Sequence, residues 1–158
     1  MFARRSRSST SSSGDLAGRV GNPGHQCLVP ISVAFRIVKA EQLEWEEYER
    51  YPGRFRAALT ELAGLRHTRA NLIRHEPGAV GPRHAERVQD ETFVPLRGTL
   101  TMYLGEPPER HEVPVGGLVH VEAGTVLQVV NETEEEVVVL VYGAPPERAG
   151  ADMFESAV

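Results

Sequence analysis

Short runs of β-forming residues follow one another along the second half of the chain, and they limit the possible folds most strongly. The runs are rich in Val, Leu, Thr and aromatic residues, and Gly, Pro or charged turns separate them. In order they read RHTRANLIRHE, ETFVPLRG, TLTMYLG, GLVHVEAG, TVLQVVNET and EEVVVLVYGA. Because no helical pattern interrupts them, they predict an all-β sandwich or barrel.

The chain has 158 residues, which is enough for one compact core, and we divide it into four predicted segments. Residues 1–24 are Ser, Gly and Arg with few large apolar side chains, which predicts a disordered tail. Residues 25–66 form an N-terminal arm with a strand and a helix, and residues 67–144 form the barrel. Residues 145–158 are an acidic tail that is either mobile or packed on a sheet edge.

The N-terminal arm contains two patterned stretches. LVPISVAFRIVKA alternates around Val33, Phe35 and Ile37, which predicts a first strand. RFRAALTELAG has apolar residues at three-to-four spacing and predicts a short amphipathic helix, with Gly64 as a left-handed cap. The apolar positions of this helix are Phe55, Ala58, Leu59 and Leu62.

Charge and cysteine content exclude several classes of partner. The formal net charge is −5 and the pI is about 5.7, which disfavours nucleic acid because phosphate binding depends on Lys and Arg. Cys27 is the single cysteine, so no intramolecular disulfide can form, and a reducing compartment is expected. No apolar run reaches membrane-spanning length, which predicts no membrane partner. We therefore expect a cytoplasmic protein.

Three residues in the stretch GAVGPRHAERVQDETFVPLRG carry the chemistry that the sequence offers. Alternate residues of a strand share a face, so His84 and Glu86 can point to one interior position. Glu91 follows a short turn and can join them from the neighbouring strand. A nitrogen and two carboxylates suit Mn²⁺, Fe²⁺ or Zn²⁺, which makes these residues the candidate metal ligands.

The spacing of this stretch resembles the first signature of the cupin superfamily, and a second stretch resembles the other. The first runs from Gly78 to Gly98, with Glu86 in place of the family's second histidine. The second runs from Gly116 to Asn131; there Glu122 stands where the family has proline, and Leu127 stands where it has a metal-binding histidine. The resemblance covers roughly residues 67 to 144 and implies a small single-domain cupin: a double-stranded β-helix, or jelly-roll barrel.

The same resemblance implies a metal centre that has changed. His84 and Glu91 occupy family ligand positions, Glu86 is a carboxylate substitute, and Leu127 cannot coordinate a metal. His75 and His120 lie in predicted strands, and either could replace the missing ligand if it faced inward. A hydrogen-bonded structural role is the alternative for both histidines.

Two functions follow from this set of residues. In the first, the barrel mouth binds a small polar molecule and the metal site is weakened or lost. In the second, the chain is a metal-dependent enzyme, an oxygenase or isomerase, with His84, Glu86 and Glu91 as ligands. Leu127 makes the opposite wall apolar and favours the first. The resemblance further implies a homodimer, which pairing of ISVAFRIV edges could form.

Overall fold

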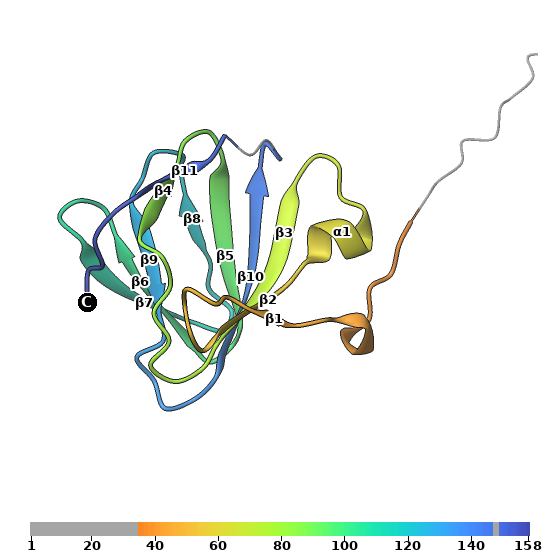
Figure 1. Cartoon of the computed structure of the whole chain (residues 1–158), viewed down its shortest axis with the longest axis horizontal. Helices are drawn as coiled ribbons and strands as arrows, with labels where there is room; N and C mark the ends of the chain where they lie inside the picture. Colours follow the sequence, from red (N-terminus) through yellow and green to blue (C-terminus); the bar gives the residue numbers. More distant parts are fainter. Residues whose placement is uncertain (1–34, 147–148) are drawn as a thin grey trace, which may run out of the picture. The chain divides into compact units, whose positions relative to one another are not determined.

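The computed structural model describes residues 35–146 and 149–158, which form two antiparallel β-sheets facing each other (Figure 1). One sheet consists of β1 (Glu46–Glu47), β2 (Arg54–Ala57), β3 (Arg69–His75), β10 (Val137–Ala144), β5 (Asp90–Arg97) and β8 (Val119–Val121), in that spatial order. The other consists of β11 (Ala151–Met153), β4 (His84–Glu86), β9 (Leu127–Val130), β6 (Thr99–Leu104) and β7 (Glu109–Pro114). This confirms the predicted all-β jelly roll.

All six predicted β-rich runs contain a strand, and their inner faces meet in one core. Leu100, Met102 and Val139 are fully buried between the sheets, together with Ile73 and Phe93. Burying each such side chain contributes roughly 1.5–3 kcal/mol, so the core supplies most of the stabilisation. Helical structure in the described residues is limited to η1 (Ala40–Gln42) and α1 (Leu59–Ala63). Neither is long and apolar enough to cross a membrane.

The predicted first strand is wrong for the part of it that the structure describes. Residues 35–39 have no regular secondary structure, and Phe35 and Ile37 are 79% and 70% exposed. Alternating apolar residues form a strand only where a neighbour accepts their backbone hydrogen bonds, and no described strand does so here. The rest of this prediction and the predicted tail at 1–24 lie outside the described residues.

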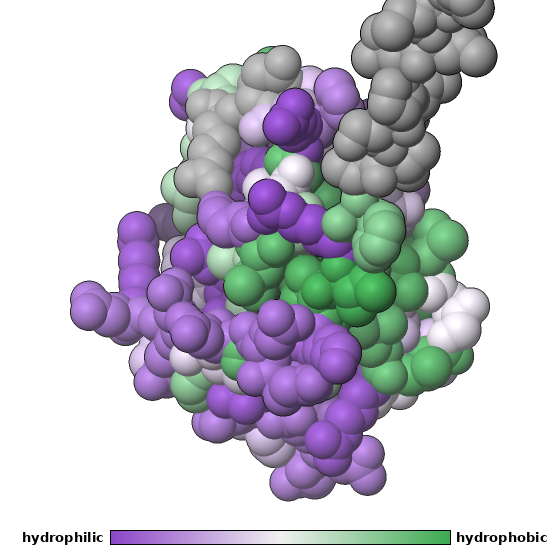
Figure 2. All heavy atoms as spheres, turned by 90° about the vertical axis from the view of Figure 1, so that its right-hand side faces the viewer, coloured by the Kyte–Doolittle hydropathy of each residue, from purple (hydrophilic) through white to green (hydrophobic). Residues whose placement is uncertain are grey.

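Exposed apolar side chains gather on the side of the molecule that carries α1. Figure 2 shows them as a green area bordered by hydrophilic residues. Leu62 and Leu65, which lie in α1 and just after it, are partly exposed there. Apolar exposure is ordinary in itself, because apolar atoms contribute roughly 55–60% of the accessible surface of a folded protein.

The predicted helix at 54–64 is half right. Residues 54–57 form β2, which pairs with β3, and only Leu59–Ala63 are helical. Phe55 lies under the guanidinium group of Arg74, 4.2 Å from ring centroid to Cζ, because the two residues are register partners on β2 and β3 and their side chains share one face of the sheet. Gly64 has φ 63° and provides the predicted left-handed cap. Pairing with β3 therefore overrode the helical spacing in the first half of this segment.

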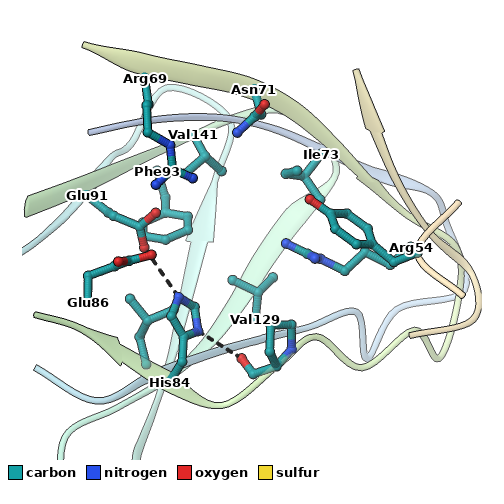
Figure 3. Close-up of a pocket in the computed structure, with 13 residues that line it drawn as sticks. Arg54, Arg69, Asn71, Ile73, His84, Glu86, Glu91, Phe93, Val129 and Val141 are labelled. Carbon is teal, nitrogen blue, oxygen red and sulfur yellow. Dashed lines mark hydrogen bonds and ion pairs between the residues drawn. The ribbon is translucent and has the colours of Figure 1, made fainter. Parts of the chain in front are cut away.

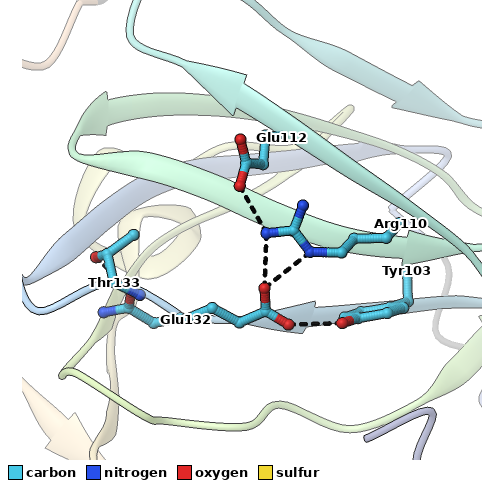
Figure 4. Close-up of polar contacts among 6 residues, drawn as sticks. Tyr103, Arg110, Glu112, Glu132 and Thr133 are labelled. Carbon is cyan, nitrogen blue, oxygen red and sulfur yellow. Dashed lines mark hydrogen bonds and ion pairs between the residues drawn. The ribbon is translucent and has the colours of Figure 1, made fainter.

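The C-terminal tail and residues 109–114 form the two edge strands of the second sheet. The C-terminal tail packs on a sheet edge through β11, which pairs with β4 so that Met153 lies opposite His84. β7 was not predicted, because it reads ERHEVP and only Val113 is partly buried. It is held on its outer side by Arg110, which bonds Glu112 and Glu132, while Tyr103 of β6 donates to Glu132 (Figure 4). A polar edge strand lacks the apolar alternation on which the prediction depended.

Gly98 lies in the turn between β5 and β6, and a substitution there tests whether this turn requires glycine. Its φ is 72°, and an added Cβ would lie 2.9 Å from Cγ2 of Val137. We expect Gly98→Ala to lower the free energy of unfolding by about 1–2 kcal/mol for the backbone and about 1–3 kcal/mol more for the clash. Gly116→Ala is the control, since its φ is also positive but nothing lies within 4 Å of the added Cβ. Equal losses in urea denaturation of the two variants would contradict the clash.

Candidate functional site

A cavity of about 220 Å³ opens between the inner faces of the two sheets. It has a charged and polar part and an apolar part. The polar and aromatic lining residues are Tyr48, Arg54, Arg69, Asn71, His84, Glu86, Glu91 and Phe93. The apolar ones are Ile73, Pro82, Leu127, Val129 and Val141. The volume lies below the ~300–1,000 Å³ of drug-sized pockets, so the cavity suits a small molecule.

The three predicted ligands lie together at one end of this cavity. His84 and Glu86 are separated by one residue on β4, and Ala85 between them is buried on the other side. Glu91 lies on β5 of the facing sheet. One ligand atom from each of the three lies within 4.8 Å of the others. Figure 3 shows the two carboxylates and the imidazole turned toward one another.

The backbone fixes the orientation of the His84 ring. Nδ1 lies 3.3 Å from the carbonyl oxygen of Pro82, so an Nδ1 proton can be donated to that oxygen. In this tautomer Nε2 carries the free lone pair. Nε2 lies 3.6 Å from Oε2 of Glu91, which is too long for a good hydrogen bond, and the two groups form an ion pair only when the ring is protonated. A hydrogen bond on one ring nitrogen commonly orients the other as a metal ligand.

Glu91 has a buried oxygen without a hydrogen-bond donor. The residue is 9% exposed, and its Oε2 has no hydrogen-bond partner among the described residues. Burying an anionic oxygen without a donor is costly, and a cation at this position would remove the cost. The three residues therefore fit a hard or borderline divalent ion such as Mn²⁺, Fe²⁺ or Zn²⁺.

The carboxylates also change the acidity of His84. Burial alone lowers the pKa of His84, but contact with the Glu91 carboxylate, the Pro82 carbonyl and the charge of Glu86 together raise it above its ordinary value. In the metal-free protein, His84 therefore holds a proton more readily than a free histidine. A divalent ion has to displace that proton in order to bind Nε2.

Leu127 stands where the family resemblance implies a further ligand. It lies on β9 directly opposite His84 in the strand register, and it is 2% exposed. Its side chain contributes an apolar surface to the cavity and packs with the core. Among the described residues, three candidate ligands are therefore available at this end of the cavity.

Neither of the other two histidines belongs to this group. His120 lies on β8 opposite Thr92, and its Nδ1 is 3.0 Å from the Thr92 hydroxyl, on the face of the sheet that is turned away from the cavity. His75 is on the inner face of β3 and is 1% exposed, but it does not line the cavity. Burial, with the nearby charge of Arg54, lowers the pKa of His75 to about 3.

The buried His75 gives a prediction for pH dependence. The folded protein keeps His75 neutral down to a pKa of about 3, whereas the unfolded chain takes up the proton near 6.5. Since the unfolded state binds more protons in this window, stability falls as pH decreases below 6.5. We expect a loss of about 2 kcal/mol between pH 7 and pH 5 from this residue alone.

The measurement is urea denaturation of the wild type and His75→Gln at both pH values, in the presence of a chelator. The raised pKa of His84 acts in the opposite direction, because it adds stability at low pH, but both proteins contain His84 and the difference cancels it. Equal pH dependence in the two proteins would contradict the neutral, buried state of His75.

Several cavity residues were missed by the sequence analysis. Arg54 was assigned to a helix, although it lies on β2, and Tyr48 precedes that strand. Arg69 and Asn71 alternate with buried Ala70 on β3, and this alternation in RANLIRH is a signal that could have placed both on one face. The sequence does not show, however, that this face of β3 lines the same cavity as His84.

Comparisons with known proteins agree with the fold and the spacing. Residues 71–143 match the model of the cupin domain family. No curated protein matches the chain. A sugar phosphate isomerase of the cupin superfamily from Silicibacter pomeroyi is 28% identical, with a TM-score of 0.62 over 68% of this chain and 74% of that one. The polyketide cyclase RemF from Streptomyces resistomycificus is 18% identical, with a TM-score of 0.68 over 78% and 88%, a likeness in fold alone. The sequence signatures, the jelly roll and the family match agree, and residues 71–143 form a cupin domain.

Proposed function

We propose that the cavity binds a small polar molecule together with a divalent metal ion, which His84, Glu86 and Glu91 hold. The carrying observation is the buried Oε2 of Glu91, which lacks a hydrogen-bond donor, within a cluster of three ligand atoms. Two neighbouring carboxylates repel each other in a site of low polarity, and a divalent ion neutralises both. The cavity in front of these ligands leaves room for the molecule to reach the ion.

Leu127 sets the expected strength of the metal site. A centre with three protein ligands keeps open positions for water or substrate, as catalytic metal sites do. It also binds the ion less tightly than a centre with a fourth imidazole. The proposal is therefore a weakened site in the sense of the first sequence-based hypothesis, with the ion and the small molecule contributing to each other's binding.

The residues of the chain have separate roles in this proposal. His84 is oriented by the Pro82 carbonyl, and Glu91 is held in the core by β5. Glu86 is half-buried on β4 and supplies the second carboxylate of the ligand group. Phe93, Val129 and Val141 form the apolar wall that excludes water around the bound molecule. When bound, a divalent ion would supply Lewis acidity toward an oxygen of that molecule.

A second candidate is a metal-dependent isomerase. It is supported by the 28% identity to a cupin that is described as a sugar phosphate isomerase. Isomerisation of an aldose phosphate by proton transfer exchanges the C2 hydrogen with solvent. Deuterium incorporation at C2 in D₂O, measured by NMR with wild type and absent with His84→Ala, would support this candidate. No exchange in wild type loaded with Mn²⁺, Fe²⁺ or Zn²⁺ would count against it.

Elemental analysis tests the proposed metal centre most directly. The protein is purified without added metal and without a metal-binding tag, and Mn, Fe and Zn are measured per chain. We then titrate the chelated protein with each ion under anaerobic conditions. Saturable binding of one ion per chain supports the centre. If the protein is isolated free of metal and shows no saturable binding, the proposed metal centre is wrong. The cavity would then bind the small polar molecule without an ion.

We further propose a homodimer, which the family resemblance implies, and a cytoplasmic location, for which the single cysteine and the lack of a membrane-spanning apolar run are the grounds. Light scattering at high micromolar concentration tests the first. A mass of 17.4 kDa, that of a single chain, would contradict the homodimer.

A further inference from the structure

Two arginines extend into the cavity without an acidic partner. Arg54 comes from β2 and Arg69 from the first position of β3, and Figure 3 shows both guanidinium groups directed into the space in front of His84 and Glu91. No carboxylate lies within 4.0 Å of either group among the described residues. Both side chains are half-buried. Their charges therefore face the cavity.

This situation is unusual in this chain. Most of the described arginines pair with a carboxylate, and those without one are exposed except for Arg54 and Arg69. The exposed ones are Arg36, Arg50 and Arg66. Water can hydrate an exposed guanidinium group, but a half-buried one needs another partner.

Arg54 shows the lack of a partner most clearly. Its Nε is buried and has no hydrogen-bond acceptor among the described residues. Its guanidinium group stacks on the ring of Tyr48, with Cζ 4.3 Å from the ring centroid, which holds the group in place without neutralising it. Burial lowers the pKa of Arg54 from its ordinary value, as expected for a charge with little access to water.

We propose that Arg54 and Arg69 form a subsite for the anionic group, a phosphate or a carboxylate, of the small molecule that the cavity binds. This deepens the proposed function and rests on it for the role of the cavity. A guanidinium group binds such anions through charge-assisted hydrogen bonds, often two at once. Asn71, on the same face of β3 as Arg69, adds an amide beside the anion.

The charges of the cavity support the same conclusion. The carboxylates of Glu86 and Glu91 are neutralised when a divalent ion is bound, and the two guanidinium charges then remain unbalanced. A ligand with one or two negative charges restores neutrality in the closed space, whereas a neutral ligand does not. We therefore expect the ion and the anion to strengthen each other's binding.

The subsite also lies largely outside the part of the chain that matches the family. The match covers residues 71–143, whereas Tyr48, Arg54 and Arg69 precede it. The β1–β2 segment thus supplies the cavity with a charge that the matched domain does not contain. In our proposal, the preference for an anionic ligand therefore depends on residues that precede the matched domain.

The test is calorimetric titration of the full chain with inorganic phosphate, acetate and glycerol in a buffer free of other oxyanions. Phosphate and acetate distinguish the two sources of negative charge, and glycerol is the neutral control. We expect Arg69→Met to weaken binding of the preferred anion by about tenfold or more, since a charge-assisted hydrogen bond is lost. Arg66→Met, which removes an exposed arginine three residues away, should stay within about twofold.

The anion affinities of wild type and Arg69→Met are compared both with and without Mn²⁺. Arg69→Met removes the same guanidinium group in either state, so the subsite is tested independently of the metal. Mn²⁺ binding is measured separately by electron paramagnetic resonance, and retained binding shows that Arg69→Met is folded. Loss of anion binding with retained Mn²⁺ binding supports the subsite. An unchanged anion affinity in Arg69→Met, or equal affinity for glycerol and both anions, overturns it. Anion binding that depends on Arg69 in a protein that binds no Mn²⁺ supports the subsite and contradicts only the metal centre.

Discussion

Replacing His84 with alanine is expected to abolish the binding of Mn²⁺, Fe²⁺ or Zn²⁺ to this protein. His84 is the one imidazole in the ligand group, and its Nε2 is the atom oriented toward Glu91. Removal of a residue that only supports a ligand costs about 10- to 100-fold in affinity, so loss of a ligand should exceed roughly 100-fold. The measurement is anaerobic titration calorimetry of chelated protein with each ion.

His111→Ala is the matched control for this experiment. His111 lies on β7 and is 47% exposed, remote from the cavity lining. It should leave metal affinity unchanged, because an exposed histidine binds a single ion only weakly. Thermal unfolding with and without Mn²⁺ gives a second readout, since an ion bound to the folded state raises the melting temperature. Retained one-to-one binding by His84→Ala would show that the ion binds elsewhere.

Leu127→His should have the opposite effect and raise the affinity by about 10- to 100-fold or more. Leu127 lies opposite His84 in the register of β4 and β9, so an imidazole there can complete a four-residue centre. The metal-free variant should be less stable than wild type by about 2–5 kcal/mol, because a fully buried leucine is replaced by a polar ring. Added ion should recover part of that loss.

Val129→His is the control for Leu127→His. Val129 lies on the same strand, also lines the cavity and is similarly buried, but it is not opposite His84. We expect it to lose stability without gaining metal affinity. If wild type already binds one ion tightly and Leu127→His changes nothing, then His84, Glu86 and Glu91 form a complete centre and the weakened-site proposal is wrong.

The two experiments together separate the possible states of the site. Loss in His84→Ala with a gain in Leu127→His indicates a weakened three-residue centre. Loss in His84→Ala alone indicates a complete one. A gain in Leu127→His from a wild type without binding indicates a site that the leucine has inactivated, in which the cavity serves a small molecule alone.

The sequence by itself determined the class of fold and one wall of the cavity. Alternation along a strand is a local property with a period of two residues, so it placed His84 and Glu86 on one face before any pairing was known. The signature spacing likewise placed Leu127 at the empty ligand position, and the structure puts it opposite His84. The six β-rich runs were found because each contains enough apolar residues to show its buried face.

Only the tertiary structure decided what faces those three residues. The spacing around Arg54 predicted a helix, but pairing with β3 made this segment a strand. Arg69 reaches the cavity because β3 lies beside β10, which is more than sixty residues later in the sequence. The structure likewise decided that Glu91 and His120 lie on opposite faces of one sheet. The register partner of His120 is Thr92, the neighbour of Glu91 on β5. The local periodicity of a sequence indicates which side chains share one face of a strand. Which faces then enclose one cavity depends on contacts between distant strands, and those contacts arise from burial of the whole core.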